Sequence, residues 1–155
     1  MATINGHVEV VKFLIAKTET LNAPNSLGFT PIHYAAKNGH TEILEALIVK
    51  IGTPLNFQTT NRRGVNTPIY IAAQNGHTEV VRMLAACTDD PNARSIRNNT
   101  PLREAAKYGH IEIVKVLAAC TADPNYIQND QGVTPRDLAL KNGHTDVVKF
   151  LDRCW

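Results

Sequence analysis

Long apolar runs are missing from this sequence, and no stretch approaches the ~18 consecutive apolar residues that a membrane-spanning helix requires. The first ten residues show no charged segment followed by an apolar one, so no secretion signal is indicated. A strong excess of one charge is also missing, because 16 Lys and Arg face 14 Asp and Glu, for a net charge of +2. With so small a net charge, the chain as a whole has little attraction for nucleic acid or for membranes.

Cysteine is scarce as well. Three cysteines are an odd number and too few for a disulfide-stapled domain, so we expect reduced thiols and an intracellular location, cytoplasmic or nuclear. The sequence also lacks a glycine-rich phosphate loop, an H-E-x-x-H motif and a nucleophile elbow. We therefore expect no enzymatic activity and no cofactor. A composition that is 43% hydrophobic and 19% charged instead indicates a soluble, folded single domain over residues 1–155.

What the sequence does contain is an internal repeat. The Gly-His pair recurs at steps of 33, 37, 33 and 34 residues, and the Thr-Pro pair recurs at the matching steps of 37, 33 and 34. The Gly-His pairs begin at Gly6, Gly39, Gly76, Gly109 and Gly143, and the Thr-Pro pairs begin at Thr30, Thr67, Thr100 and Thr134. Two independent pairs in one phase predict about five units, approximately 1–29, 30–66, 67–99, 100–133 and 134–155.

The second unit shows how each unit is expected to fold. Thr30 suits a helix N-cap, and Pro31 suits the first helical position, where its missing N–H removes no hydrogen bond. Asn38-Gly39 ends this short helix, because glycine readily adopts the left-handed conformation of a tight turn. A second helix follows, with apolar residues at positions i, i+1 and i+4 that bury one face. These apolar positions are Ile43, Leu44 and Leu47, then Val80, Val81 and Leu84, then Ile113, Val114 and Leu117, then Val147, Val148 and Leu151. The polar stretch before the next Thr-Pro pair indicates a loop or β-hairpin.

The run Thr30-Pro-Ile-His-Tyr-Ala-Ala-Lys-Asn-Gly-His40-Thr-Glu-Ile-Leu resembles the ankyrin consensus T-P-L-H-x-A-A-x-x-G-H-x-E-I-V, and the resemblance covers essentially the whole chain. It implies an all-α repeat solenoid of about five ankyrin repeats, the first of them incomplete. Each unit would be a helix-turn-helix with a projecting β-hairpin or loop. The resemblance also implies a concave groove, built from the hairpins and first helices, that binds a protein partner.

The chain departs from this pattern in three places. The first unit has no Thr-Pro pair and begins in the middle of its first helix, so we expect an excerpt of a longer array, because terminal repeats normally carry a polar cap. In the last unit, Asp152 and Arg153 replace the Ala-Ala of earlier units, which fits a natural or an engineered cap. The hairpin between the second and third units is three residues longer than its neighbours, and such a loop is either a recognition element or a tolerated insertion.

The histidines and cysteines all occupy repeat positions. Five of the six histidines lie in Gly-His pairs, and His33 lies in a Thr-Pro-x-His slot. The resemblance implies that these rings bond to backbone across repeat junctions, and equivalent rings are too far apart to share a zinc ion, so no metal is expected. Cys87, Cys120 and Cys154 each follow the last leucine of the apolar stripe by three residues. This ladder predicts structural thiols, because a disulfide requires Cα atoms within ~7 Å.

Positions that the repeat does not fix are the candidates for partner contact. By resemblance to the family, they lie at the hairpin tips and on the inner face of the first helices, where Asn38, Asn75 and Asn142 also lie. The candidate contact residues are Phe29, Tyr34, Lys37, Arg62, Arg63, Asn66, Tyr70, Gln74, Arg94, Arg97, Arg103, Glu104, Lys107, Tyr108 and Lys141. A basic patch is expected in the third and fourth units from Arg62, Arg63, Arg94, Arg97, Arg103 and Lys107, with Tyr70 and Tyr108 among them. Because Arg and Tyr are frequent interface hot spots, this patch suits an acidic segment of a partner; the alternative is a solvated surface.

The His33 slot is occupied by Tyr70, Arg103 and Asp137 in the later units. Two interpretations stay open, since the groove is either specialised there or its junctions are stabilised in another way. In the family, the position of Asn22, Asn92 and Asn125 resembles a target of asparagine hydroxylation. Structural hydrogen bonding explains these asparagines equally well.

The expected function is therefore a protein–protein interaction scaffold that acts as a monomer. A competing hypothesis is that the Arg/Tyr cluster binds an anionic small molecule or single-stranded nucleic acid. Rings would then stack on Tyr70 and Tyr108 while arginines hold the phosphates. The net charge of +2 argues against nucleic acid as the ligand, because nucleic-acid binders usually carry a large basic excess.

Overall fold

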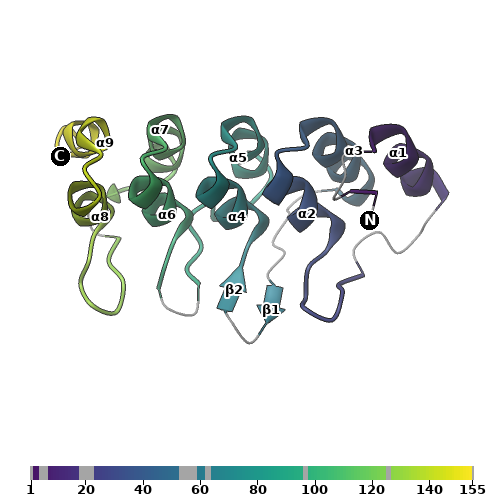
Figure 1. Cartoon of the computed structure of the whole chain (residues 1–155), viewed down its shortest axis with the longest axis horizontal. Helices are drawn as coiled ribbons and strands as arrows, with labels where there is room; N and C mark the ends of the chain where they lie inside the picture. Colours follow the sequence, from purple (N-terminus) through teal and green to yellow (C-terminus); the bar gives the residue numbers. More distant parts are fainter. Residues whose placement is uncertain are drawn as a thin grey trace.

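The computed structural model describes residues 2–3, 7–17, 23–52, 59–61, 64–95, 98–124 and 127–154, with the backbone alone for 59–61 and 64–66. The described helices form two parallel rows, with α1 and α9 at opposite ends of the molecule (Figure 1). The inner row contains α2 (Pro31–Asn38), α4 (Pro68–Asn75), α6 (Pro101–Tyr108) and α8 (Pro135–Lys141). The outer row contains α1 (Val8–Lys17), α3 (Thr41–Ile51), α5 (Thr78–Ala85), α7 (Ile111–Ala119) and α9 (Thr145–Leu151).

The predicted threonine cap and glycine stop are both present in α4 and α6; α2 shows the glycine stop, and α8 shows the threonine cap but ends at Asn142 with φ of −97°. The hydroxyl oxygens of Thr67 and Thr100 accept hydrogen bonds from the backbone N–H of the third helical residue, at 3.2 and 3.3 Å. The helices end at Gly39, Gly76 and Gly109, which adopt the left-handed conformation with φ of 72°, 79° and 75°. A threonine cap and a glycine stop therefore set the length of an inner helix at about two turns.

The Gly-His pair joins neighbouring units. The Nε2–H of His77 donates to the carbonyl oxygen of Lys37 at 2.9 Å, and that of His144 donates to the carbonyl oxygen of Lys107 at 3.0 Å. A Cβ atom added to Gly109 would lie 2.4 Å from Nδ1 of His144, so the ring packs directly on the glycine of the preceding unit. For His77 and His144, the expected bond across the repeat junction is confirmed.

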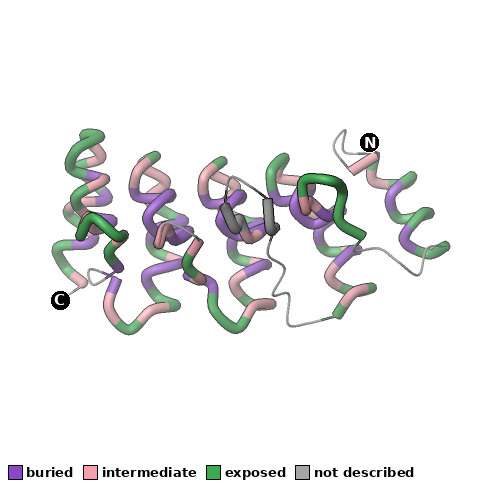
Figure 2. Tube along the Cα trace, turned by 90° about the horizontal axis from the view of Figure 1, so that it is seen from below, coloured by how far each residue is buried: buried purple, intermediate pink, exposed green. Residues whose placement is uncertain are grey.

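The core lies between the two rows of helices, where Figure 2 shows the buried backbone running through every unit. The predicted apolar stripe is buried there, as Ile43, Leu44 and Leu47 with 0–1% exposure illustrate, except that Val148 in the last unit is half-exposed. The small side chains of Ala35 and Ala36, both 0% exposed, allow inner and outer helices to approach closely. Burying one leucine or isoleucine fully stabilises the fold by roughly 1.5–3 kcal/mol, so the repeated stripe is the main source of stability.

The longer hairpin between the second and third units contains two short strands. β1 (Thr59–Asn61) and β2 (Gly64–Asn66) pair antiparallel, with Thr59 opposite Asn66 and Asn61 opposite Gly64. Figure 1 shows this hairpin projecting from the side of the inner row, away from the outer helices. The expected β-hairpin is confirmed at this position.

The architecture confirms the predicted all-α repeat solenoid, in which successive helix-turn-helix units stack side by side. Among the described residues, no helix has the length and apolar character needed to cross a lipid bilayer.

Candidate protein-binding surface

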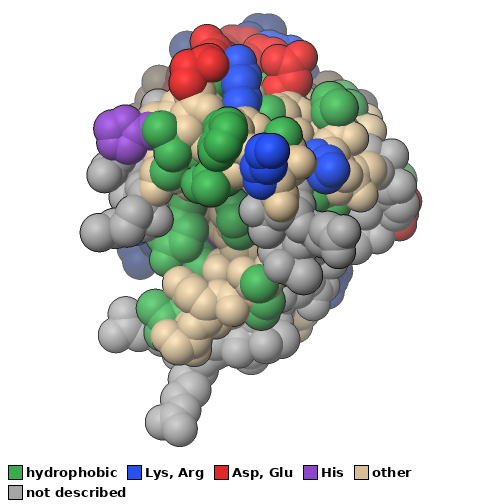
Figure 3. All heavy atoms as spheres, turned by 90° about the vertical axis from the view of Figure 1, so that its right-hand side faces the viewer, with side chains coloured by type: hydrophobic (Ala, Val, Ile, Leu, Met, Phe, Trp, Pro, Cys, Tyr) green, Lys and Arg blue, Asp and Glu red, His purple; other side chains and the backbone are tan. Residues whose placement is uncertain are grey.

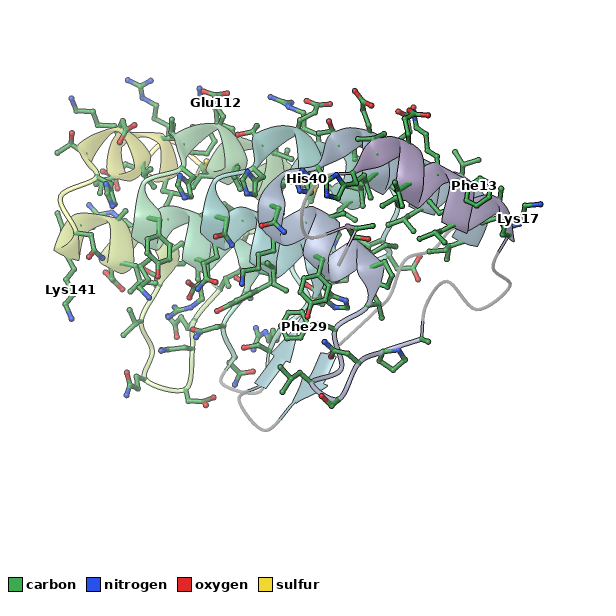
Figure 4. The ribbon with its side chains drawn as sticks, turned by 45° about the vertical axis from the view of Figure 1, so that its right-hand side comes forward. Phe13, Lys17, Phe29, His40, Glu112 and Lys141 are labelled. Carbon is green, nitrogen blue, oxygen red and sulfur yellow. The ribbon has the colours of Figure 1, made fainter. Side chains whose placement is uncertain are left out.

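The last turn of each inner helix presents two polar or aromatic residues, seven and eight positions after the threonine of its Thr-Pro pair. Together these residues are called the inner-helix surface: Lys37, Asn38, Gln74, Asn75, Lys107, Tyr108, Lys141 and Asn142, all exposed or half-exposed. Figure 4 shows Lys141 projecting from α8 on the side of the projecting loops, whereas Glu112 of α7 projects from the opposite edge. Because packed helices lie roughly 8–10 Å apart, the row advances by about that distance per unit.

The asparagines of the inner-helix surface share one geometry. The side-chain Nδ2 of Asn38, Asn75 and Asn142 donates to the carbonyl oxygen four residues earlier, at 2.9, 2.8 and 2.7 Å. The bond fixes the amide against its own helix. Since only one N–H of each amide is engaged, the amide oxygen and the second N–H are the groups that these side chains can offer to a ligand.

An aromatic cluster lies beside the first of these inner helices. Phe29 precedes α2, and its ring centroid is 5.7 Å from that of Tyr34 and 5.6 Å from that of His33 (Figure 4). The loop holds this arrangement, because Asn25 donates its Nδ2–H to the Tyr34 hydroxyl at 2.9 Å. The same asparagine accepts the Phe29 N–H at 3.0 Å. Phe29 and Tyr34 are half-exposed, as the partner-contact prediction requires.

A second aromatic group lies on α6. Tyr108 is 44% exposed, and the ammonium of Lys107 lies 4.9 Å from its ring centroid, within cation–π range. The His110 ring also stacks on Tyr108, with ring centroids 6.2 Å apart. An exposed tyrosine held by two neighbours loses little side-chain entropy on binding, which is the property of an interface anchor.

Three of the predicted contact residues lie beneath the surface, which corrects the sequence-based site. Arg103, Glu104 and Tyr70 are 2%, 5% and 9% exposed. Residues so deeply buried have almost no area to offer a partner. The expected basic patch therefore loses Arg103, and the stacking platform of the competing ligand hypothesis loses Tyr70.

Arg103 instead ties α6 to the loop before it and to the loop that leads into α8. Its Nε–H donates to the side-chain oxygen of Asn99 at 3.2 Å, and its guanidinium donates to the carbonyl oxygen of Val133. Burial lowers the pKa of the Arg103 guanidinium, while Glu104 acts in the opposite direction. Of the two interpretations of the changed slot, this contact supports a junction stabilised in another way.

Glu104 is the acidic centre of the same network. Its carboxylate accepts a hydrogen bond from Gln74 Nε2 of the preceding unit at 3.2 Å, and the Lys107 ammonium lies 3.9 Å away. Burial raises the pKa of the Tyr70 hydroxyl, and its hydrogen bond and charge interaction with Glu104 raise it further. The buried carboxylate thus connects α4 to α6 and restrains two members of the inner-helix surface.

The slot that holds His33 serves as a helix cap where the side chain allows it. Nδ1 of His33 lies 3.1 Å from the backbone nitrogen of Thr30 and 2.8 Å from its hydroxyl oxygen. The carboxylate of Asp137 accepts the equivalent bonds from the N–H and hydroxyl of Thr134, at 2.9 and 2.7 Å. The Thr134 N–H is the main cause of the lowered pKa of Asp137. These bonds lie within one unit and cap the inner helix that begins there, so the slot has a capping role that the resemblance did not imply.

Several of the predicted contact residues lie in parts of the chain that the structure does not describe. Arg62, Arg63 and Arg97 lie outside the described residues, as does the side chain of Asn66. Arg94 is described and exposed. The convergence of the arginines into one patch therefore stays a prediction.

Asn92 has a structural role. Its Nδ2–H donates to the carbonyl oxygen of Leu117 in the next unit at 2.9 Å, and its side-chain oxygen accepts the Leu102 N–H at 3.3 Å. The residue is 8% exposed, so both ends of a buried amide are satisfied. Structural hydrogen bonding explains this asparagine, while Asn22 and Asn125 lie outside the described residues.

Charges on the outer helices are arranged differently from those on the inner ones. Three outer helices carry acid–base pairs three residues apart, at 3.7, 4.0 and 2.7 Å: Glu9–Lys12, Glu79–Arg82 and Glu112–Lys115. Within the described part of the chain, no ion pair is recorded for Lys37 or Lys141. The same described residues show no ion pair for the outer lysines Lys50 and Lys149, so these match Lys37 and Lys141 in exposure and charge.

A polar recess of about 410 Å³ separates the tips of the last two projecting loops, lined by Asn99, Asn129, Asp130 and Gln131. A hydrogen bond from Asn98 to Asp130 links the two loops. The sequence does not predict the bond from Arg103 to Asn99, because nothing in the local pattern distinguishes one loop asparagine from another.

No group of three or more His, Cys, Asp or Glu lies close enough to hold a metal ion within the described ranges. Cys87, Cys120 and Cys154 are not joined in disulfides.

The end of the molecule at α1 is apolar, and Figure 3 shows hydrophobic side chains gathered on it. Val10 and Leu14 are 52% and 47% exposed, whereas their equivalents in the next unit, Ile43 and Leu47, are 0% and 1% exposed. In the second unit α3 packs against the inner helix α2, whereas the described residues of the first unit include no inner helix before α1.

Known proteins share the repeat pattern of this chain. A family model described as ankyrin repeats in three copies matches residues 49–128 and 69–153, and a second, described as ankyrin repeats in many copies, matches residues 1–48. The human protein named ankyrin repeat domain-containing protein 39 is 43% identical over 47 residues, which are 30% of this chain and 26% of the relative. Its bovine counterpart is 46% identical over 39 residues, 25% of this chain and 21% of the relative. The matched stretch thus spans about a quarter of the length of these relatives.

Proposed function

Because the chain belongs to the ankyrin repeat family, whose repeats are generally protein–protein interaction modules, we propose that it binds a protein partner through the inner-helix surface and the adjoining loops. The observation that carries this proposal is the row of equivalent side chains on successive inner helices. Residues in such a row are not needed to bury the core. They are available for recognition, while the outer helices and the apolar stripe hold them in place.

The charge of this row favours an acidic partner segment. Lys37 and Lys141 are exposed, and Lys107 lies between them in the row, held against the Tyr108 ring. The lysines supply positive charge, and the aromatic side chains supply apolar contact area. Arginines of the hairpins, Arg62 and Arg97, would extend the same charge toward the loop tips.

The buried network under the row supports this function by limiting motion. Glu104 joins α4 to α6, and Arg103 joins α6 to the next loop. A surface that is already rigid loses less conformational entropy when a partner binds. Tyr70 and Arg103 are buried, so the Arg/Tyr cluster offers neither this ring for stacking nor this guanidinium for a phosphate of a nucleic acid or small anion.

Matched charge reversals test the placement. The variant Lys37→Glu/Lys141→Glu changes two exposed inner lysines, and Lys50→Glu/Lys149→Glu changes two exposed outer lysines by the same charge. Proteins retained from a cell extract of the source organism by the unmodified chain are quantified by mass spectrometry and compared with those retained by each variant. We expect a specific set of proteins to be retained at least tenfold less by the inner variant than by the unmodified chain. The outer variant should retain this set at the level of the unmodified chain.

Equal retention by both variants would overturn the placement. The variant Arg62→Glu/Arg97→Glu tests the loops in the same assay, with the outer variant Lys50→Glu/Lys149→Glu as the control of equal charge change. Melting temperatures within about two degrees of the unmodified chain establish that each variant is folded, because surface substitutions usually change stability by less than ~0.5 kcal/mol.

A further inference from the structure

The inner-helix surface has a fixed period, and this period constrains the shape of its partner. Lys37, Gln74, Lys107 and Lys141 each lie seven residues after the threonine that starts their helix. Neighbouring units are in direct contact along this row, as the bond from Gln74 to Glu104 and the bond from His144 to the backbone of Lys107 demonstrate. Successive positions are therefore one helix spacing apart, roughly 8–10 Å.

An extended polypeptide can match this spacing in one conformation especially well. A polyproline II helix rises ~3.1 Å per residue with three residues per turn, so every third side chain points the same way at intervals of roughly 9 Å. In a β-strand, side chains on one face recur at roughly 6.5–7 Å, which does not match the row. An α-helix reaches about 10.5 Å only with a seven-residue interval.

On the premise of the proposed function, we propose that the partner contributes an extended segment in the polyproline II conformation with an acidic residue at every third position. Its carboxylates bind Lys37, Lys107 and Lys141, and the residue opposite Gln74 accepts a hydrogen bond or is itself acidic. The segment lies across the inner helices and spans four consecutive units.

The asparagine row supplies a second set of contacts to the same segment. A polyproline II backbone makes no internal hydrogen bonds, so its N–H groups need acceptors. The amide oxygens of Asn38, Asn75 and Asn142 can accept these bonds, and the bond of one N–H of each amide to its own helix holds the group in a fixed orientation. These asparagines directly follow Lys37, Gln74 and Lys141 in the sequence, so the acceptors recur with the same period as the charges.

The neutral residue at the second position of the row, Gln74, adds specificity. Gln74 is half-exposed and donates to the buried Glu104, so it offers a hydrogen bond without a positive charge. The Lys107 ammonium lies 3.9 Å from the Glu104 carboxylate, which reduces its attraction for an acidic partner. Lys107 is half-exposed, so it can still contact the partner. Lys37 and Lys141 at the two ends are consequently the strongest electrostatic contacts.

Synthetic peptides test the period directly. Two fluorescent peptides share one composition of four Glu, four Pro and four Ala, with glutamate at every third position in the first and at every second position in the second. A third fluorescent peptide is longer, alanine-rich and helix-forming, contains no proline, and carries four glutamates seven residues apart. Fluorescence anisotropy at low salt is measured for the unmodified chain, for Lys37→Glu/Lys141→Glu and for the outer control Lys50→Glu/Lys149→Glu.

We expect the three-residue peptide to bind at least tenfold more tightly than the two-residue peptide, and more tightly than the helical one. The affinity of the inner variant for the three-residue peptide should be at least tenfold lower than that of the unmodified chain, and the affinity of the outer control should be unchanged. Added salt should weaken the binding, because the contact is between exposed charges.

The outcomes separate this inference from the proposed function. Equal affinity for all peptides, lost in the inner variant, would overturn the three-residue period while leaving an acidic partner on the inner-helix surface. Tightest binding of the helical peptide would overturn the extended conformation. Binding that is equal in the inner and outer variants, or absent at millimolar peptide, would overturn the inference; the extract experiment then decides whether the inner-helix surface binds a protein of other chemistry.

Discussion

Replacement of Arg103 by alanine is expected to destabilise the protein although it changes a residue that the sequence assigned to the surface. The side chain is 2% exposed and donates to Asn99 and to the carbonyl oxygen of Val133. Truncation removes the guanidinium donors of both acceptors and the positive charge beside Glu104, whose carboxylate is 5% exposed. Breaking a buried ionic network by removing one partner costs roughly 3–5 kcal/mol.

For a chain of this length, each kcal/mol lowers the melting temperature by roughly 2–4 °C, so the expected decrease is about 6–20 °C. Urea unfolding followed by circular dichroism measures the free-energy change, and Arg94→Ala is the control because Arg94 is exposed. The control should lose no more than ~0.5 kcal/mol. A loss for Arg103→Ala that equals the loss for Arg94→Ala would refute the structural role of Arg103.

Three further substitutions test other parts of the structure. Gly109→Ala should lower the free energy of unfolding by more than Gly143→Ala in urea titrations, because both glycines have positive φ but only Gly109 has a histidine ring 2.4 Å from the added Cβ; equal losses would contradict the packing. Asn92→Ala should cost roughly 2–5 kcal/mol, since it leaves two backbone groups of the next unit without their partner, and a loss under 1 kcal/mol would count against this role. The pKa of Asp137 is lowered by Thr134, so its carboxylate stabilises the fold above its usual pKa of ~3.9 and this contribution is lost as pH falls through the lower folded value. Asp137→Asn should thus reduce the melting temperature at pH 7 more than at pH 3, and an equal reduction at both would oppose it.

Much of the fold could be predicted from sequence because the same few residues act in every unit. Thr-Pro and Gly-His specify the ends of the inner helices through local backbone geometry alone, and Thr67 and Gly76 show the predicted bonds and dihedral angles. The apolar stripe needs only a period to be recognised, and Leu47 and Leu117 are buried as that period indicates. Features repeated four or five times are visible without knowledge of any contact.

The candidate site was predicted less well, because it depends on contacts between residues far apart in sequence. Arg103 and Tyr70 have the composition of a binding surface, and no local pattern reveals that the loop ending at Val133 covers one of them. The capping role of Asp137 could have been found from the Thr-x-x-Asp spacing, which is a helix-start signal. By contrast, the bond from Gln74 to Glu104 joins two units, and only the stacked structure brings these residues together.

The central claim is that the inner helices, and not the outer ones, contact the partner. A photo-crosslinking amino acid placed at Asn75 of α4 or at Arg82 of α5 compares the two faces of one unit, since both positions are exposed. Irradiation in an extract of the source organism, followed by mass spectrometry of the adducts, is the measurement. The inner position should give specific adducts that added salt diminishes, while the outer position gives none of them. The same adducts from Arg82 alone, or equally from both positions, would contradict the claim.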